Sequence, residues 1–542
     1  VVMNRKNLTA AVLAGLAGVA GIVGSAQAVN INPDGLGQVL IYPYYTTNGG
    51  NSTVLSVVNT TENAKAVKVR FKEGTNSREV LDFNLYLSKY DVWTAAIFDD
   101  AGTPTLRVND NSCTVPYLYA HNDGKQAFLV FGMNDQVDPD EFGDISRATE
   151  GYFEMIEMGT IDAESNTETI VTHVDGMPPL TGGTGEDDEG AAACKGVVDA
   201  WTITDDLTGD GGYWIDQQTG DPEIDLDTPS GGLFGGAAII NVGNGQMFSY
   251  DAKALNGFAM RDEGGAGILH GEPGNSYPSL NDGNVWDAAV FTDSGEVFYS
   301  ETFGRGVDAV SFVFMHDAIM NEYTTEGAVA GATEWVIAFP TKSFYTYDDA
   351  DAVPPVDPFV SEWDAETETS CEPVLLDTIY DRNEQTLVSV DPSGNPIPPI
   401  VSPRPPGLVI TPDPYEPFDL CYEVSVIEFG PADDDLVVNP LLATSGILGS
   451  SNFHNIDNTA LGFEHGWARL DMYNYETDVD EDGVAELNQR NELGGLLGLP
   501  VTGFAVQGFT NGFLGEGSNT LANYGGIFQH KATRAMGSLG GY

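Results

Sequence analysis

The chain has 542 residues, with 22 basic and 81 acidic side chains and a net charge of −59. This acidity argues against nucleic-acid binding, because phosphate recognition requires a basic surface. It favours the binding of divalent cations, with salt adaptation and solubility as the alternative explanations. Hydrophobic residues make up 42% of the chain, which is enough for a core and argues against wholesale disorder.

Residues 1–28 have the pattern of a secretory signal peptide. Arg5 and Lys6 precede an apolar run over residues 10–23, and Ala26-Gln27-Ala28 matches the small residues of a cleavage site. No later apolar run reaches the ~18–20 residues of a membrane-spanning helix. We therefore expect an exported protein of the cell surface or extracellular space, with the periplasm as the alternative location.

The clearest structural pattern follows at residues 38–98. Apolar and polar residues alternate over 67–72 and 81–87, which predicts strands with one dry face and one wet face. Asn/Gly-rich turns separate the strands at the spacing of an immunoglobulin-like sandwich. The predicted fold is mainly β: a large antiparallel β-sandwich with an immunoglobulin-like module at 29–100 and few short helices.

This module is electrostatically distinct, with eight acidic and six basic residues over 29–100. Two interpretations of its cations stay open. The first is an ordinary solvated sheet face. The second is a docking site for an acidic surface, such as another copy of the chain or another cell-surface component. The candidate partner-binding residues are Lys65, Lys68, Arg70, Lys72 and Arg78.

The remaining chain divides by composition. Residues 101–388 are a β-rich region with acidic insertions, residues 389–417 are a Pro-rich loop, and residues 418–542 are a C-terminal β region that we expect to pack with the 29–100 module. No internal repeat of fixed period is visible. Apolar runs predict further strands at 150–158, 234–242, 307–315, 334–341, 466–472 and 502–508, and residues 190–201 predict a short helix.

The four cysteines form an even set, which in an exported chain predicts two disulfides. Three connectivities are possible. We favour pairing between neighbours in the sequence, Cys113 with Cys194 and Cys371 with Cys421. The second bridge would close the base of the Pro-rich loop.

The best candidate site is an acidic loop at residues 478–486. Asp478, Asp480 and Asp482 occupy positions 1, 3 and 5, Gly483 is at position 6, and Glu486 offers a further carboxylate. Alternate carboxylates on a tight turn suit calcium, which prefers six to eight oxygen ligands. A solvated acidic turn is the alternative, and Asp205-Asp206 begins a weaker second candidate.

Catalytic signatures are weak, so no catalytic residue is assigned. The chain has no G-x-S-x-G or H-E-x-x-H motif, and its seven histidines are scattered. Trp93, Trp201, Trp335 and Trp467 could stack on sugars, although their strand contexts favour the core. A secreted polysaccharide-binding protein or hydrolase is therefore kept as the alternative function.

Several motifs resemble a family of exported proteins of Gram-negative bacteria for which no activity is established. These are GLGQVLIYPYYT at 35–46, ATEGYFEMIEM at 148–158, TEWVIAFPTK at 333–342, GLPVTGFAVQGF at 498–509 and LANYGGIFQHKATR at 521–534. The resemblance implies a surface role and assigns no residue a function. The expected function is a non-enzymatic, calcium-stabilised and self-assembling structural or interaction protein.

Overall fold

The structure is a computed structural model. It describes residues 28–118, 122–129, 145–173, 191–261, 267–292, 295–300, 302–346, 357–361, 363–364, 369–384, 418–431, 443–459, 461–472, 477–479, 485–487, 491–515 and 520–537. The predicted signal peptide up to residue 27 and the Pro-rich loop lie outside these ranges. Among the described residues, no helix combines the length and apolar character needed to cross a membrane.

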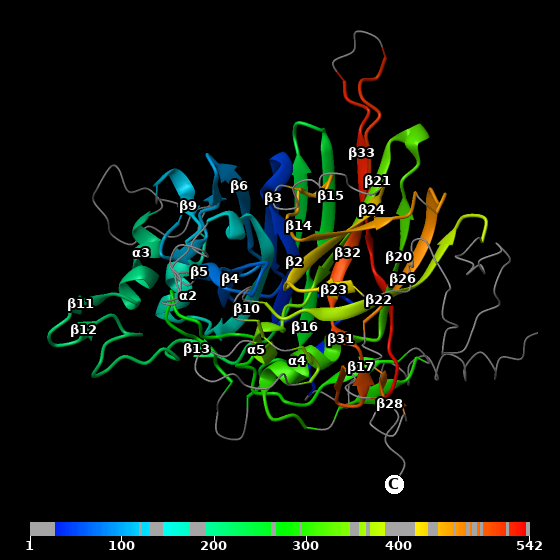
Figure 1. Ribbon diagram of the computed structural model, residues 1–542. Helices are drawn as coiled ribbons and strands as arrows, with labels where there is room; N and C mark the ends of the chain where they lie inside the picture. The colour runs from blue at the N-terminus through cyan, green and yellow to red at the C-terminus, as the bar shows by residue number, and fades with distance from the viewer. Residues whose placement is uncertain are drawn as a thin grey trace, which may run out of the picture.

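Four larger sheets form the body of the described structure (Figure 1). Sheet 1 has the strand order β1 (Asn30–Ile31), β16 (Lys253–Asn256), β2 (Val39–Thr46), β10 (Glu150–Ile161), β4 (Lys65–Glu73), β5 (Glu79–Leu87), β8 (Cys113–Val115). Sheet 2 has the order β15 (Gln246–Asp251), β14 (Leu233–Asn241), β3 (Asn51–Asn59), β6 (Val92–Asp100), β7 (Thr103–Val108), β9 (Lys125–Ala127).

The other two sheets come from the C-terminal half of the chain. Sheet 3 has the order β23 (Phe418–Leu420), β22 (Glu372–Asp381), β26 (His465–Asp471), β20 (Ala318–Thr324), β34 (Lys531–Thr533). Sheet 4 has the order β25 (Phe453–Asp457), β24 (Val424–Gly430), β21 (Gly331–Ala338), β32 (Thr502–Phe509), β33 (Tyr524–Gln529). The mainly β, largely antiparallel fold expected from the sequence is confirmed.

The sheets stack as layers with shared cores. One face of sheet 1 packs on sheet 2, where Leu55 and Trp93 are buried, and also on sheet 4, where Phe504 is buried. Sheet 3 packs on the other face of sheet 4, against Trp335. The second face of sheet 1 is covered by residues 257–261 and 267–290 and by helices. These are α2 (Asn166–Val171), α3 (Ala191–Ala200) and α4 (Gly306–Phe314).

The helix predicted at 190–201 is α3. The strand predicted at 307–315 is wrong, because Gly306–Phe314 forms the buried helix α4. A short continuous apolar run has no periodicity that separates a buried strand from a buried helix. Strands of the 29–100 segment pair with strands from outside it, β4 with β10 and β3 with β14. The C-terminal region contacts this segment, where the Val424 amide donates to the Gly74 carbonyl at 2.9 Å.

The four sheets form two copies of one ten-strand arrangement. The first repeat (residues 39–256) and the second repeat (residues 318–533) have the same strand order in both sheets and the same order along the chain. Strands β2, β3, β4, β5, β6, β7, β10, β14, β15 and β16 correspond to β20, β21, β22, β23, β24, β25, β26, β32, β33 and β34. One pairing differs: β7 is antiparallel to β6, whereas β25 is parallel to β24.

Side-chain contacts repeat with the strands. Thr53 Oγ1 accepts the Thr46 amide at 3.0 Å and donates to the Thr46 carbonyl at 3.0 Å. In the second repeat, Thr333 Oγ1 accepts the Thr324 amide at 2.8 Å and donates to the Thr324 carbonyl at 3.0 Å. Each threonine hydroxyl thus bonds both the amide and the carbonyl of the last residue of the preceding strand. The two repeats therefore share the same hairpin geometry.

Two pairs of equivalent glycines mark close approaches of the backbone. A Cβ on Gly235 would lie 2.3 Å from the Ser56 carbonyl, and one on Gly503 would lie 1.9 Å from the equivalent Val336 carbonyl. A Cβ on Gly151 would lie 2.0 Å from Lys72 O, and the same atom on Gly466 would lie 1.7 Å from Tyr380 O. The coincidence of both positions shows that the repeats share register as well as topology.

The repeats meet through equivalent edge strands. β15 of sheet 2 and β33 of sheet 4 lie side by side (Figure 1). Across this junction, Asn523 Nδ2 donates to the Asn244 carbonyl at 2.7 Å and Lys253 Nζ donates to Gln529 Oε1 at 2.9 Å. Sheets 2 and 4 therefore run edge to edge beneath sheet 1.

Candidate functional site

The cationic strand β4 is buried. Lys65 and Lys68 are fully buried, and Arg70 is 3% exposed. The expected cationic surface is therefore wrong for these three residues, because helices and residues 257–261 and 267–290 cover the second face of sheet 1. Alternation along a strand shows that its two faces differ, but it does not show whether the polar face reaches solvent.

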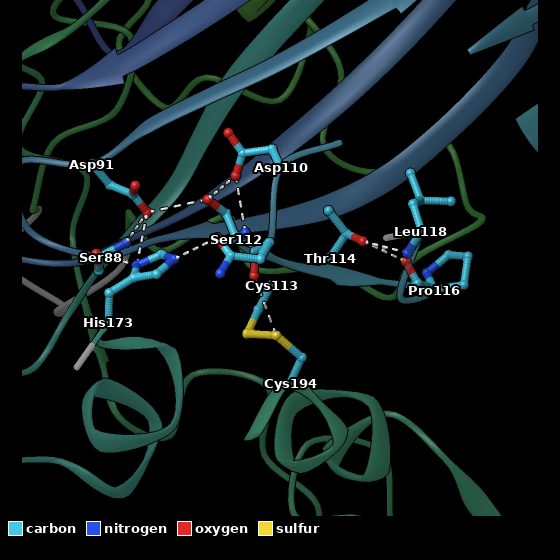
Figure 2. The surroundings of a disulfide bond; sticks show 11 residues. Ser88, Asp91, Asp110, Ser112, Cys113, Thr114, Pro116, Leu118, His173 and Cys194 are labelled. Atoms are coloured by element: carbon cyan, nitrogen blue, oxygen red, sulfur yellow. Dashed lines mark hydrogen bonds and ion pairs between the residues drawn. A yellow bond between two sulfur atoms is a disulfide. The ribbon is translucent and has the colours of Figure 1, made fainter. Parts of the chain in front are cut away.

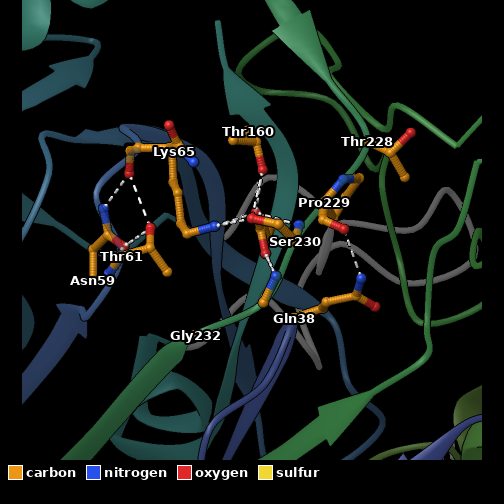
Figure 3. A network of polar contacts seen from close by, with 12 residues as sticks. Gln38, Asn59, Thr61, Lys65, Thr160, Thr228, Pro229, Ser230 and Gly232 are labelled. Carbon is orange, nitrogen blue, oxygen red and sulfur yellow. Dashed lines mark hydrogen bonds and ion pairs between the residues drawn. The ribbon is translucent and has the colours of Figure 1, made fainter. Parts of the chain in front are cut away.

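Lys65 lies in a closed polar network. Its Nζ contacts Glu157 Oε1 at 2.7 Å and donates to Ser230 Oγ at 2.8 Å. Thr160 Oγ1 lies 2.9 Å from the same Ser230 hydroxyl (Figure 3). Glu157 also accepts the Gly231 amide at 2.7 Å. The network joins β4 and β10 to the segment that leads into β14.

Lys68 and Arg70 pair with acids on neighbouring strands. Lys68 Nζ lies 2.5 Å from Asp82 Oδ2 on β5. Arg70 contacts Glu79 at 2.7 Å and Glu154 at 3.2 Å, and it donates to the Pro278 carbonyl at 3.2 Å. A buried charge without a partner is costly, so these pairs let sheet 1 be covered on both faces.

The last two cations are partly buried. Lys72 lies 3.9 Å from Glu79, and burial together with the nearby Arg70 charge lowers its pKa to about 8. Arg78 lies in the turn before β5, where its amide donates to Glu73 Oε1 at 3.1 Å. Burial also lowers the pKa of Lys68 and raises the pKa of Glu154. Lys65, Lys68 and Arg70 therefore act inside the fold, between strands.

Both predicted disulfides are confirmed. Cys113 bridges Cys194, which fastens α3 to strand β8. Cys371 bridges Cys421. Beside the second bridge, Lys342 Nζ donates to the Ser370 carbonyl at 2.5 Å and to the Cys421 carbonyl at 3.0 Å. This lysine therefore holds both ends of the loop that the bridge closes.

A Ser–His–Asp group lies near the first bridge (Figure 2). His173 Nδ1 is 3.0 Å from Ser88 Oγ and 3.6 Å from Asp91 Oδ2, while its Nε2 faces Asn111 Oδ1 at 3.3 Å. A nucleophile relay needs serine and aspartate on opposite ring nitrogens. Here both approach Nδ1, and Asp91 Oδ2 also accepts the Ser88 amide at 3.0 Å. The arrangement ties loops together and lacks the geometry of a hydrolase triad.

Two buried glutamates, one from each repeat, hold the loop at 445–451. Glu150 accepts the Ser451 amide at 3.0 Å and the Tyr44 hydroxyl at 2.9 Å. Glu334 accepts the Ser445 hydroxyl at 2.9 Å and the Leu448 amide at 3.0 Å. Burial raises the pKa of Glu334 to about 7 in spite of these donors. The loop is thus a polar fastening between the repeats.

A small cavity lies where the two repeats meet. Its volume is about 90 Å³, and its lining includes Lys253, His316 and His530. Burial lowers the pKa of His530 to about 4 and holds the pKa of His316 well below its usual range, so both imidazoles are neutral at pH 7. Ligand pockets generally measure roughly 300–1,000 Å³, so this cavity is too small for such a ligand.

The candidate calcium loop is described only in part. Strands β27 (Thr477–Val479) and β28 (Ala485–Leu487) pair as a hairpin, with Asp478 directly opposite Glu486. Asp480 and Asp482 lie outside the described residues. In the weaker candidate, Asp205 Oδ1 accepts the Leu207 amide at 2.9 Å, which is an ordinary turn contact. Over the residues that the structure describes, no cluster of three or more metal-ligating side chains is found.

Most of the tryptophans named as possible sugar platforms belong to the core. Trp93 and Trp335 are fully buried and Trp201 is 8% exposed. Trp467 is 40% exposed and stacks on Tyr380, with ring centroids 5.3 Å apart. This pair lies on adjacent strands of sheet 3 and leaves part of one indole ring accessible.

The acidic partners of the cations were missed by sequence reasoning. The signal that could have found them is the run of acids at Glu150, Glu154 and Glu157 within an otherwise apolar strand. An acid in a strand that is buried throughout needs a cation or hydrogen-bond donors nearby.

Comparisons with protein-family models, curated proteins and solved structures found no match for this chain.

Proposed function

We propose that the chain is an exported, non-enzymatic structural or interaction protein of the cell surface or extracellular space. The observation that carries the proposal is that its buried ionisable side chains hold parts of the fold together. Lysines, arginines and glutamates that meet inside the fold pair with each other or with the backbone and fasten strands, loops and repeats. The signal-like N-terminus, the two disulfides and the motif resemblance support export.

Fractionation of cells that express the full chain tests the location. We expect the mature protein outside the cytoplasm, with both disulfides formed, and digestible by protease added to intact cells. A cytoplasmic chain with reduced cysteines would overturn the proposal. A protein that is exported but protected until the outer membrane is opened would place it in the periplasm.

Calcium stabilisation is part of the proposal and rests on the 478–486 loop, whose paired strands bring Asp478 opposite Glu486 in backbone register. We expect millimolar calcium to raise the melting temperature, and the double substitution Asp480→Asn/Asp482→Asn to remove that rise. Asp205→Asn/Asp206→Asn in the other acidic turn is the matched control and should keep it. Superimposable melting curves with and without calcium would remove calcium from the proposal.

Polysaccharide binding is the second candidate, favoured by the half-exposed Trp467 stacked on Tyr380. An aromatic face of this kind suits a sugar ring. A glycan array with the native chain and with Trp467→Ala separates the two functions. Hits that disappear in the variant would favour polysaccharide binding, and an array without hits would dispose of it.

A further inference from the structure

The outer face of sheet 2, turned away from sheet 1, has an uncharged stretch that crosses β3, β6 and β14. Three charged residues border this stretch: Asp100 at the end of β6, Arg107 on β7 and Asp251 on β15. Along β3, β6 and β14, alternate residues are buried in the core and the others point outward. We name these outward residues the open face: Ser52, Val54, Ser56, Val58, Val92, Thr94, Ala96, Phe98, Phe234, Gly236, Ala238 and Ile240. None of the twelve is charged, in a chain with a net charge of −59.

Large apolar side chains of the open face are solvent-accessible. Val54 is 39% exposed, Val92 48% and Phe234 42%, and the neighbouring Met247 on β15 is 56% exposed. A solvated antiparallel sheet normally carries polar and charged residues on its wet face. A contiguous apolar patch on the surface marks an interaction site.

The second repeat shows what covers this face. By the shared register, Ser56, Thr94 and Gly236 correspond to Val336, Val426 and Phe504. The latter three are fully buried in the core shared with sheet 1 of the first repeat. Phe504 stacks on Tyr250 of the first repeat, with centroids 4.8 Å apart. In the second repeat this face is therefore an interface with another sandwich of the same kind.

We propose that the open face of sheet 2 binds the open face of a second copy of this chain, about a two-fold axis. The inference rests on the proposed structural role and names the partner. Two such sheets can pack face to face at about 10 Å, like the layers of any β-sandwich. An isologous contact sets the uncharged patch against itself, so the centre of the contact contains no charge and the bordering charges lie at its rim.

The charge distribution points to the same partner. A basic protein would be attracted to the acidic surfaces of the chain and would gain no Coulomb energy at the open face. Two copies repel one another through their net charge everywhere else. The dimer should therefore strengthen as salt screens that repulsion.

Sedimentation velocity of the purified mature chain tests the proposal at several protein concentrations and at low and high sodium chloride. We expect a dimer that is favoured by salt. Phe234→Asp and Val54→Asp each place a carboxylate on the open face and should weaken dimerisation at least tenfold. Leu207→Asp is the matched control, because Leu207 is 97% exposed in the β11 (Ile203–Asp205) to β12 (Asp210–Gly211) turn outside sheet 2.

Cross-linking gives a second measurement that does not depend on a destabilising charge. All four native cysteines are bridged, so Ser56→Cys introduces a single free thiol. Mild oxidation should yield a covalent dimer, and Leu207→Cys should not. A wild-type monomer under every condition, or a dimer unaffected by both aspartate variants, would overturn the inference. Either result leaves the exported location standing, and a cytoplasmic location would overturn only the proposed function.

Discussion

The two repeats place the same strands in different surroundings. In the first repeat, sheet 1 is covered on both faces. On the face turned away from sheet 2, strand β4 carries Lys68 and Arg70 in buried ion pairs. In the second repeat, the equivalent strand β22 places Thr378 and Tyr380 at partly exposed positions. The arrangement of strands thus survives while the outward residues change with what covers them.

Sheets 2 and 4 show the opposite difference, with the covered sheet in the second repeat. The outward face of sheet 4 is buried, while that of sheet 2 is exposed. Glu334 in sheet 4 occupies the position of Val54 in sheet 2, so the buried site has the acid and the exposed site has the apolar residue. The inversion has a local cause, because Glu334 accepts hydrogen bonds from the 445–451 loop, whereas Val54 is 39% exposed.

The substitutions with the largest expected effect test whether the two repeats share the same close approach of neighbouring strands. Gly235→Ala and Gly503→Ala should each lower the free energy of unfolding by about 4 kcal/mol or prevent folding, because each new Cβ meets a carbonyl oxygen of the adjacent strand. Gly304→Ala, with no atom within 4 Å of the added Cβ, is the control. Urea denaturation measures the change. A tolerated alanine at only one of the two positions would break the equivalence.

A second test contrasts covered and uncovered positions. Arg70→Met should cost about 3–5 kcal/mol, because Glu154 stays buried without its cation. The equivalent Thr378→Met should cost less than about 1 kcal/mol, since that position is partly exposed. Chemical denaturation of both variants gives the difference. Equal costs would mean that the covering layer does not decide the role of this strand.

The third test uses pH. Burial raises the pKa of Glu334 to about 7, so the folded chain keeps a proton that the unfolded chain releases near its ordinary value of 4.5. The resulting stability is fully present below pH 4.5 and is lost as pH rises to about 7. Glu334→Gln should flatten this part of the stability profile by on the order of 3 kcal/mol. The exposed Glu464→Gln should leave it unchanged. An unaltered profile in Glu334→Gln would show that the carboxyl group titrates normally.

The smallest effect concerns the hairpin threonines. Thr53→Val and Thr333→Val each remove one hydroxyl that serves an amide and a carbonyl of the preceding strand. Both should lower the free energy of unfolding by about 1–2 kcal/mol, by similar amounts. Thermal melts of the two variants, compared with Thr60→Val at an exposed turn, measure it. A cost in only one variant would limit the equivalence to the backbone.

Alternation and cysteine count predicted much of the fold. Strands β2, β4, β5, β10 and β32 lie where period-2 patterns and apolar runs placed them, and both disulfides pair as expected. Helix α4 was missed because its apolar run lacks periodicity. The duplication was missed because insertions of different length separate equivalent strands, so few residues, such as Tyr45-Thr46 and Tyr323-Thr324, remain alike. Burial of the cations depends on a covering layer that is distant in the sequence.

The duplication also limits the number of faces through which two molecules can associate. Sheets 2 and 4 have equivalent outward faces. The face of sheet 4 is buried within the chain, so its contact is intramolecular and does not dissociate on dilution. Under the proposed pairing, the four described sheets leave each molecule with one such face. Objects with one such face close as pairs, whereas a free face on each repeat would permit open chains. Fusion of two sandwiches into one polypeptide thus limits how far association through this face can proceed.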